Sequence, residues 1–153
     1  MSGALAIRAA IHEALRGDEA LLTLVNQVSD GTPDKASAPW LMLGEGVATG
    51  WGARQVDGVA LRQPVQLALR GDDFARATAI MARVDTVLAG LDADLGDWRI
   101  TSLRLARSRV TRAGVEAGCW GGLLLRLARS RVTRGRSGWR IDADYAVRVA
   151  RLG

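Results

Sequence analysis

The sequence predicts an α+β domain, in which helices pack on one face of a mainly antiparallel sheet of about four strands. Two segments, near the start and in the middle of the chain, place apolar residues at helical spacing. Other segments alternate apolar and polar residues with period two, which is typical of half-buried strands. The order is helix, helix, strand, strand, helix, strand, strand, and this order predicts the class.

The chain opens with two predicted helices. The segment ALAIRAAIHEALRG has an apolar stripe at helical spacing, and Gly17 ends it. Asp18 is a suitable N-cap for a second, short helix that extends to Val25. Residues 29–39 hold turn-forming side chains and are expected to be a loop.

Two strands and a helix are predicted in the middle of the chain. WLMLG, at 40–44, is a short buried strand, and the glycine-rich segment 44–58 is expected to be a long mobile loop. LRQPVQLALR, at 61–70, alternates cleanly. Its Pro64 places it at a sheet edge or at the start of a strand, because proline cannot donate a ladder hydrogen bond. A helix with an aspartate N-cap follows and ends at Gly90.

The last third of the chain is predicted to be β-structure. WRITSLRLARSRVTR begins after Gly96, and WRIDADYAVRV near the end has the clearest period-two pattern. Apolar residues of this last segment share one face, and its charged residues share the other. For LLLRLARSRVTR, at 123–134, the alternative is a basic amphipathic helix at a membrane surface. Arginines surround its apolar face, and this favours a strand.

The charge of the chain is unevenly distributed. Its 153 residues suffice for one domain, and 48% of them are hydrophobic. Residues 1–96 hold 8 basic and 12 acidic side chains, whereas residues 97–153 hold 13 basic and 4 acidic ones. The basic half predicts a partner that is nucleic acid or an acidic protein surface; the alternative is a solvated, arginine-rich surface. We expect a soluble chain, because no uncharged run approaches the roughly 18 residues of a membrane span, and charged residues interrupt the N-terminal apolar stretch.

No group of residues in the sequence predicts an enzyme. His12 is the only histidine and Cys119 the only cysteine, so a triad or a zinc site lacks convergent partners. Asp92, Asp94 and Asp97 resemble a calcium loop in spacing only, and we expect a capped turn there. The glycine-rich segment lacks the lysine and the helix of a phosphate-binding loop. We therefore expect no catalytic residue, no metal and no cofactor.

The ten residues LRLARSRVTR occur twice, at 103–112 and at 125–134. We expect a single domain over residues 1–153, with a 22-residue duplication inserted at about 113–134. Two copies side by side would place arginines in neighbouring rungs, which is unfavourable for like charges. We therefore expect one copy in the sheet and the other in a projecting arm or an irregular loop. Three explanations of the duplication remain open: a functional arm, a tolerated insertion and an error in the sequence.

The layout of these segments resembles the tail terminator, or tail completion, proteins of long-tailed phages and gene transfer agents. ALAIRAAIHEALRGDEALLTLV is similar to the first helix of that family and the short helix after it. SDGTPDKASAPWLMLGEG is similar to its proline-bounded run into the first strand. LRQPVQLALRGDDFARATAIMARVDTVLAGL looks like its central strand and helix, and SLRLARSRVTR with GWRIDADYAVRVARLG looks like its final hairpin. The resemblance covers nearly the whole chain except 113–134.

The resemblance implies a structural virion protein without catalytic residues. It implies a hexameric ring that caps the completed tail tube and provides the docking surface for the head–tail connector (stopper) protein. DNA would pass through the lumen without sequence-specific binding, and no membrane would be involved. Such a protein would be made in the bacterial cytoplasm and located in the tail of a phage or phage-like particle. A heterologous interface that closes on itself makes a ring, in which neighbours cover open sheet edges.

Two groups of residues are predicted to contact protein partners. Trp51 is the bulky anchor of the glycine-rich segment, and with Arg54 it is expected to meet a neighbouring copy or the tube. In the second repeat, the expected contact residues are Arg126, Arg129, Arg131 and Arg134. The alternative function is a basic α+β nucleic-acid-binding module. Against it, Trp139 and Tyr145 share the predicted core face and are poor stacking platforms.

Overall fold

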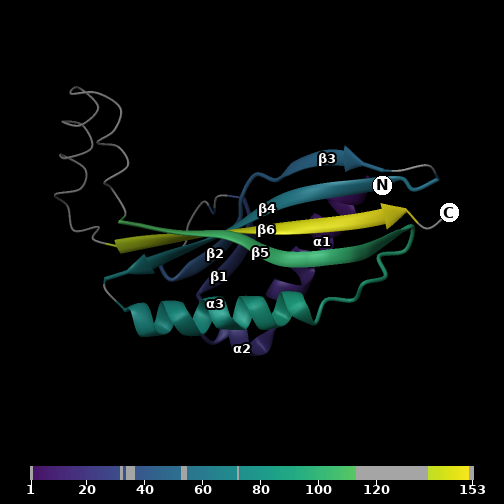
Figure 1. Cartoon of the computed structure of the whole chain (residues 1–153). Helices are drawn as coiled ribbons and strands as arrows, with labels where there is room; N and C mark the ends of the chain where they lie inside the picture. Colours follow the sequence, from purple (N-terminus) through teal and green to yellow (C-terminus); the bar gives the residue numbers. More distant parts are fainter. Residues whose placement is uncertain are drawn as a thin grey trace, which may run out of the picture.

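The chain forms a six-stranded sheet with helices on one face (Figure 1). This computed structural model describes residues 2–31, 33, 37–52, 55–71, 73–112 and 138–151. The elements, in order, are α1 (Gly3–Arg16), α2 (Glu19–Leu22), β1 (Gln27–Asp30), β2 (Trp40–Leu43), β3 (Val47–Trp51), β4 (Gly58–Arg70), α3 (Phe74–Ala89), β5 (Trp98–Arg112) and β6 (Gly138–Arg151). The predicted α+β class is confirmed, although the sheet has six strands rather than about four.

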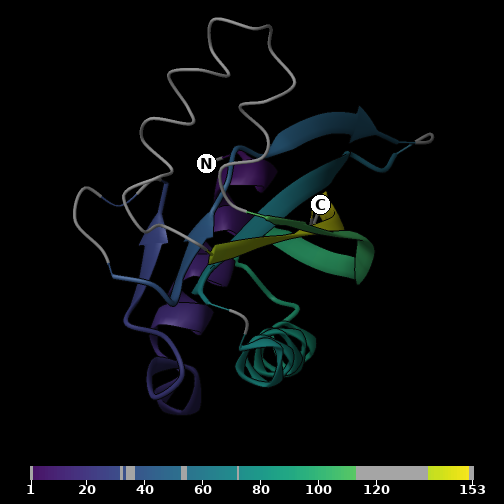
Figure 2. The same cartoon turned by 90° about the vertical axis from the view of Figure 1, so that its left-hand side faces the viewer.

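The two long helices begin at side-chain caps and bury one stripe each. The side chain of Ser2 accepts a hydrogen bond from the backbone N–H of Leu5, and that of Asp73 accepts one from Arg76. The buried stripes are Gly3, Ile7, Ile11 and Leu15 in α1, and Ala77, Ile80, Val84 and Leu88 in α3. Figure 2 looks down the axis of α3 and shows this helix beneath β5 and β6. The core therefore lies between one face of the sheet and the two helices.

The sheet has the order β1–β2–β4–β6–β5, and β3 also pairs with β4. All neighbouring strands are antiparallel except β1 and β2. β4 and β6 pair along their whole length, from Gly58 opposite Ala150 to Arg70 opposite Gly138. Alternate residues of these two strands are buried against the helices. The opposite face of the sheet carries the polar residues, as the period-two pattern predicted.

The prediction of a mobile loop over 44–58 is wrong, because this segment contains β3. β3 pairs with the first part of β4, from Val47 opposite Arg62 to Trp51 opposite Gly58. β2 pairs with the later part of the same edge of β4, from Trp40 opposite Ala68 to Leu43 opposite Val65. β2 and β3 thus behave as one strand interrupted at residues 44–46. The ladder with β4 supplies hydrogen bonds that the glycine-rich sequence does not specify locally.

Pro64 lies in the interior of β4, so its assignment to an edge or a strand start is also wrong. Its carbonyl accepts a hydrogen bond from the N–H of Gly44, at the interruption between β2 and β3. In an antiparallel strand the N–H and C=O of one residue point to the same neighbour. The N–H that proline lacks would therefore face this interruption, where no ladder partner is needed. A central strand tolerates proline here because the adjacent strand is broken.

The region between α1 and β2 also differs from the prediction. Residues 27–30, placed partly in a loop by the sequence analysis, form β1, which pairs in parallel with β2 from Gln27 opposite Trp40 to Asp30 opposite Leu43. The second helix ends at Leu22 rather than at Val25. Parallel pairing joins segments that are separated in sequence, and no local pattern encodes it.

The first copy of the repeat, residues 103–112, lies in β5, and this confirms that one copy belongs to the sheet. β5 pairs with β6 from Trp98 opposite Arg151 to Arg112 opposite Trp139, with irregularities between Ile100 and Ser102 and between Leu105 and Arg107. The expected insertion at 113–134, with the second copy, lies outside the described residues.

Deletion of residues 103–124 is expected to leave a folded protein. The remaining copy of LRLARSRVTR has the same sequence and replaces the first one in β5. Because Arg112 pairs with Trp139, only Gly135, Arg136, Ser137 and Gly138 would then connect β5 to β6, a length common in hairpins. Denaturant titration should give a free energy of unfolding within about 1–2 kcal/mol of the parent. If the deletion variant fails to fold, the 22 deleted residues contribute to the core, and the prediction is wrong.

Candidate interaction surfaces

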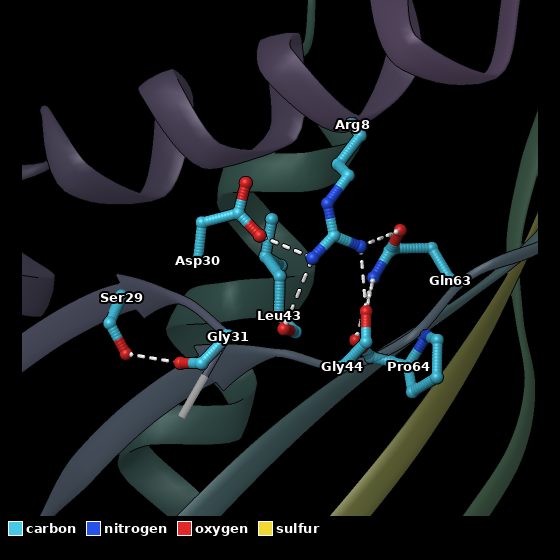
Figure 3. A network of polar contacts seen from close by, with 8 residues as sticks. All are labelled: Arg8, Ser29, Asp30, Gly31, Leu43, Gly44, Gln63 and Pro64. Carbon is cyan, nitrogen blue, oxygen red and sulfur yellow. Dashed lines mark hydrogen bonds and ion pairs between the residues drawn. The ribbon is translucent and has the colours of Figure 1, made fainter. Parts of the chain in front are cut away.

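A polar network joins α1 to the interruption between β2 and β3 (Figure 3). The guanidinium of Arg8 donates to the carbonyl of Gly44 at 2.6 Å and to Oε1 of Gln63 at 3.2 Å, and it forms an ion pair with Asp30. Gln63 is fully buried, and its Nε2 donates to the carbonyls of Gly44 and Pro64 at 2.9 and 3.0 Å. These charge-assisted hydrogen bonds are partly buried, and they hold the side chains of Arg8 and Gln63 in one geometry.

Glycine at position 46 leaves room for this network. A Cβ there would lie 2.9 Å from Oε1 of Gln63. The apolar patterns did not predict this network, although the sequence holds one signal of it. Gln63 lies two residues from both Leu61 and Val65 in β4, so the alternation of the strand places this glutamine on the core face. A buried amide requires hydrogen-bond partners, and Arg8 supplies one from a distant part of the chain.

Trp51, predicted as a contact anchor, packs half-buried on its own sheet at the end of β3. Gly58 lies opposite it, and a Cβ at position 58 would lie 2.4 Å from Cε2 of the indole. The guanidinium of Arg148 lies over the ring, 5.8 Å from its centroid. Arg54, Arg126, Arg129, Arg131 and Arg134 lie outside the described residues, so Trp51 is the one predicted contact residue whose position is defined.

The sheet face that points away from α1 and α3 is rich in arginine. The pairing registers place on it Arg62 and Arg70 of β4, Arg99, Arg104, Arg107 and Arg109 of β5, and Arg140 and Arg148 of β6. We call this surface the arginine face. The carboxylates beside them are Asp142 and Asp144 on β6 and Glu45 at the margin. Asp144 forms an ion pair with Arg107 at 3.0 Å.

The other face of β5 carries exposed apolar side chains. Leu105 and Val110 lie opposite Tyr145 and Ile141, which are buried, yet they are 46% and 52% exposed. Phe74, at the start of α3, is 43% exposed and contacts Trp139, with the ring centroids 5.2 Å apart. We call Phe74, Leu105 and Val110 the β5 apolar strip. Because β5 is an edge strand within the described part of the chain, these side chains are available to a neighbouring molecule.

Two polar pairs tie the helices to the rest of the fold. The hydroxyl of Tyr145 donates to Asp85 of α3, and burial together with this hydrogen bond raises the pKa of Tyr145 far above its ordinary value. Arg83 of α3 donates to both carboxylate oxygens of Asp18 at 2.7 Å, and these hydrogen bonds lower the pKa of Asp18. Both pairs fix α3 in place, so we assign them a structural role.

The described residues contain no group of acidic, histidine or cysteine side chains that could hold a metal ion. The carboxylates of Asp92 and Asp94 accept hydrogen bonds from the N–H groups of Asp94 and Gly96, which makes the predicted capped turn. His12 is partly buried on α1, and Cys119 lies outside the described residues. No helix in the described part of the chain is long and apolar enough to cross a membrane.

One family model and two solved structures are similar to this chain. A sequence model described as tail completion protein gp17 matches residues 9–121. A chain from the virion of a native gene transfer agent (GTA) particle is similar over 97% of this chain and 96% of its own, with 25% identity and a TM-score of 0.70. The bacteriophage SPP1 gp17 protein is similar in fold over 98% of this chain and 91% of its own, with 17% identity and a TM-score of 0.51. No curated protein matches this chain.

Proposed function

This chain belongs to the tail completion protein gp17 family, and we propose that it forms a closed ring of six copies that caps the completed tail tube of a phage or gene transfer agent. The head side of the ring would provide the docking surface for the head–tail connector. The observation that carries the proposal is the similarity, over nearly the full length of both chains, to a chain of a gene transfer agent virion. This role requires binding surfaces rather than catalytic groups.

Free strand edges on opposite sides of the sheet support a ring. In the described part of the chain, β5 pairs only with β6, and β3 pairs only with β4. β3 is exposed from Val47 to Gly50, so neither of its faces is well covered within the subunit. Two different edges that meet head to tail form a heterologous interface, and such an interface makes a ring when the rotation between neighbours closes. Neighbouring copies would cover β3, β5 and the β5 apolar strip.

The proposal is tested by measuring the mass of the protein and its ability to complete tails. Native mass spectrometry of the full chain, alone and with tail tubes, is expected to show six copies in the presence of tubes. Tails made without the protein should fail to join DNA-filled heads, and the added protein should restore joining. A protein that stays monomeric with tail tubes, or that does not restore joining, would contradict the proposed function.

A further inference from the structure

We propose that the arginine face lines the DNA path of the ring and contacts the phosphate backbone of the duplex without reading its sequence. This inference rests on the proposed function, because the ring defines the path. It assigns a role to the side chains on the sheet face that does not pack against the core.

The arginines of this face are mostly exposed, and most of them form no ion pair with a carboxylate of the described residues. Arg62, Arg99, Arg104 and Arg109 are exposed, and none of them forms an ion pair with a described residue. Arg107 does pair with Asp144, but its side chain is still 75% exposed. Charges left without partners on one surface create a positive potential that attracts a polyanion. The face is therefore suited to a ligand with many negative charges.

The composition of the face favours nucleic acid over an acidic protein. Protein interfaces have cores that are depleted of charge and enriched in large apolar side chains. Of the strongly exposed large apolar side chains in the described strands, only Val47 lies on the arginine face, whereas Leu105 and Val110 lie on the helix side. Trp40, Met42 and Trp51 are half-buried at the β2–β3 margin of the face. On β5, the exposed apolar side chains and the arginines thus lie on opposite faces of the strand.

The spacing of the arginines fits a phosphate backbone. Residues on neighbouring strands are about 4.8 Å apart, and alternate residues of one strand are about 6.6 Å apart. Arg104 of β5 and Arg62 of β4 both lie next to Ala146 of β6, so these two arginines flank an alanine in one rung of the sheet. Duplex DNA carries about one charge per 1.7 Å of its axis, so several of these side chains meet phosphates at once. Such contacts are independent of sequence, as a conduit for DNA requires.

The test compares two double variants of the full-length protein that carry the same net charge. Arg99→Gln/Arg104→Gln alters the arginine face, and Arg16→Gln/Arg76→Gln alters exposed arginines of the helical layer. Binding to a fluorescent duplex of about 30 base pairs is measured by anisotropy from about 50 to 200 mM salt, with two unrelated sequences. The face variant is expected to bind about tenfold more weakly at the lowest salt and to lose about 2 units of the salt slope. The control should stay within about twofold of the parent, and both sequences should bind alike.

Several outcomes would overturn the inference. Equal binding by the two double variants would show that the arginine face is not the DNA contact. Displacement of the duplex by polyglutamate at an equal or lower concentration of charge would favour an acidic protein as the occupant. A protein that binds DNA through these arginines but never forms a ring would favour the nucleic-acid-binding module instead.

The same variants separate this inference from the proposed function. Native mass and head joining are measured on the parent and on both double variants. If the parent fails in these assays, the proposed function is wrong, whatever its DNA binding. If the parent assembles and the face variant still binds DNA like the control, only the inference about the arginine face is wrong. We expect the face variant to keep the mass of the parent, because the free strand edges and the β5 apolar strip are unchanged.

Discussion

Replacement of Arg8 by alanine is expected to lower the free energy of unfolding by about 2–4 kcal/mol, a large effect for a residue that is not in the apolar core. The variant would lose the hydrogen bonds to Gly44 and Gln63 and the ion pair with Asp30. Oε1 of the fully buried Gln63 would lose its partner, and an unsatisfied buried acceptor costs about 1–3 kcal/mol. The Arg8 side chain is itself only 24% exposed, so water replaces these contacts incompletely.

Denaturant titration measures the loss in the free energy of unfolding. Two further variants show whether this loss comes from the network. Arg16→Ala removes an exposed arginine of the same helix and should change the free energy of unfolding by no more than about 0.5 kcal/mol. The double variant Arg8→Met/Gln63→Leu removes both partners and should be less destabilised than the sum of the two single variants. Additive effects would show that the two residues are not coupled. Hydrogen exchange in β3 should accelerate in Arg8→Ala, since the network holds the interruption before this strand.

Replacement of Val110 by aspartate is expected to abolish ring formation and to leave the subunit folded. Val110 is 52% exposed, so the substitution should cost the isolated subunit no more than about 1 kcal/mol. In a ring that covers the β5 apolar strip, the new carboxylate is buried without a partner at every interface. An uncompensated buried charge costs several kcal/mol, so the association constant of each interface should fall at least about 100-fold.

Analytical ultracentrifugation with and without tail tubes measures the assembly, and circular dichroism confirms the fold. Leu22→Asp is the matched control, because Leu22 is 44% exposed on α2, on the helical layer and not on β5. The control should assemble like the parent. Normal assembly of Val110→Asp would show that the β5 apolar strip lies outside the subunit interface.

The sequence was most informative where a pattern and a cap agree. α3 begins after an aspartate N-cap, which is Asp73, and ends before Gly90, as predicted, and β5 spans the predicted segment from Trp98 to Arg112. The alternation of β6 also identified its buried face. Side-chain periodicity is a local consequence of strand and helix geometry, so it can be read without knowing the neighbours. The contact residues proposed for the second repeat lie outside the described residues and stay predictions.

By itself, the sequence determined the α+β class, the two long helices, the amphipathic strands and the excess of arginine in the last third of the chain. Only the tertiary structure decided that the glycine-rich segment forms β3, that Pro64 fits inside a central strand and that Gln63 is buried beside Arg8. The physical reason is the same in each case. These features depend on hydrogen bonds to residues that are distant in sequence, and such partners are set by the register of the sheet rather than by local propensity.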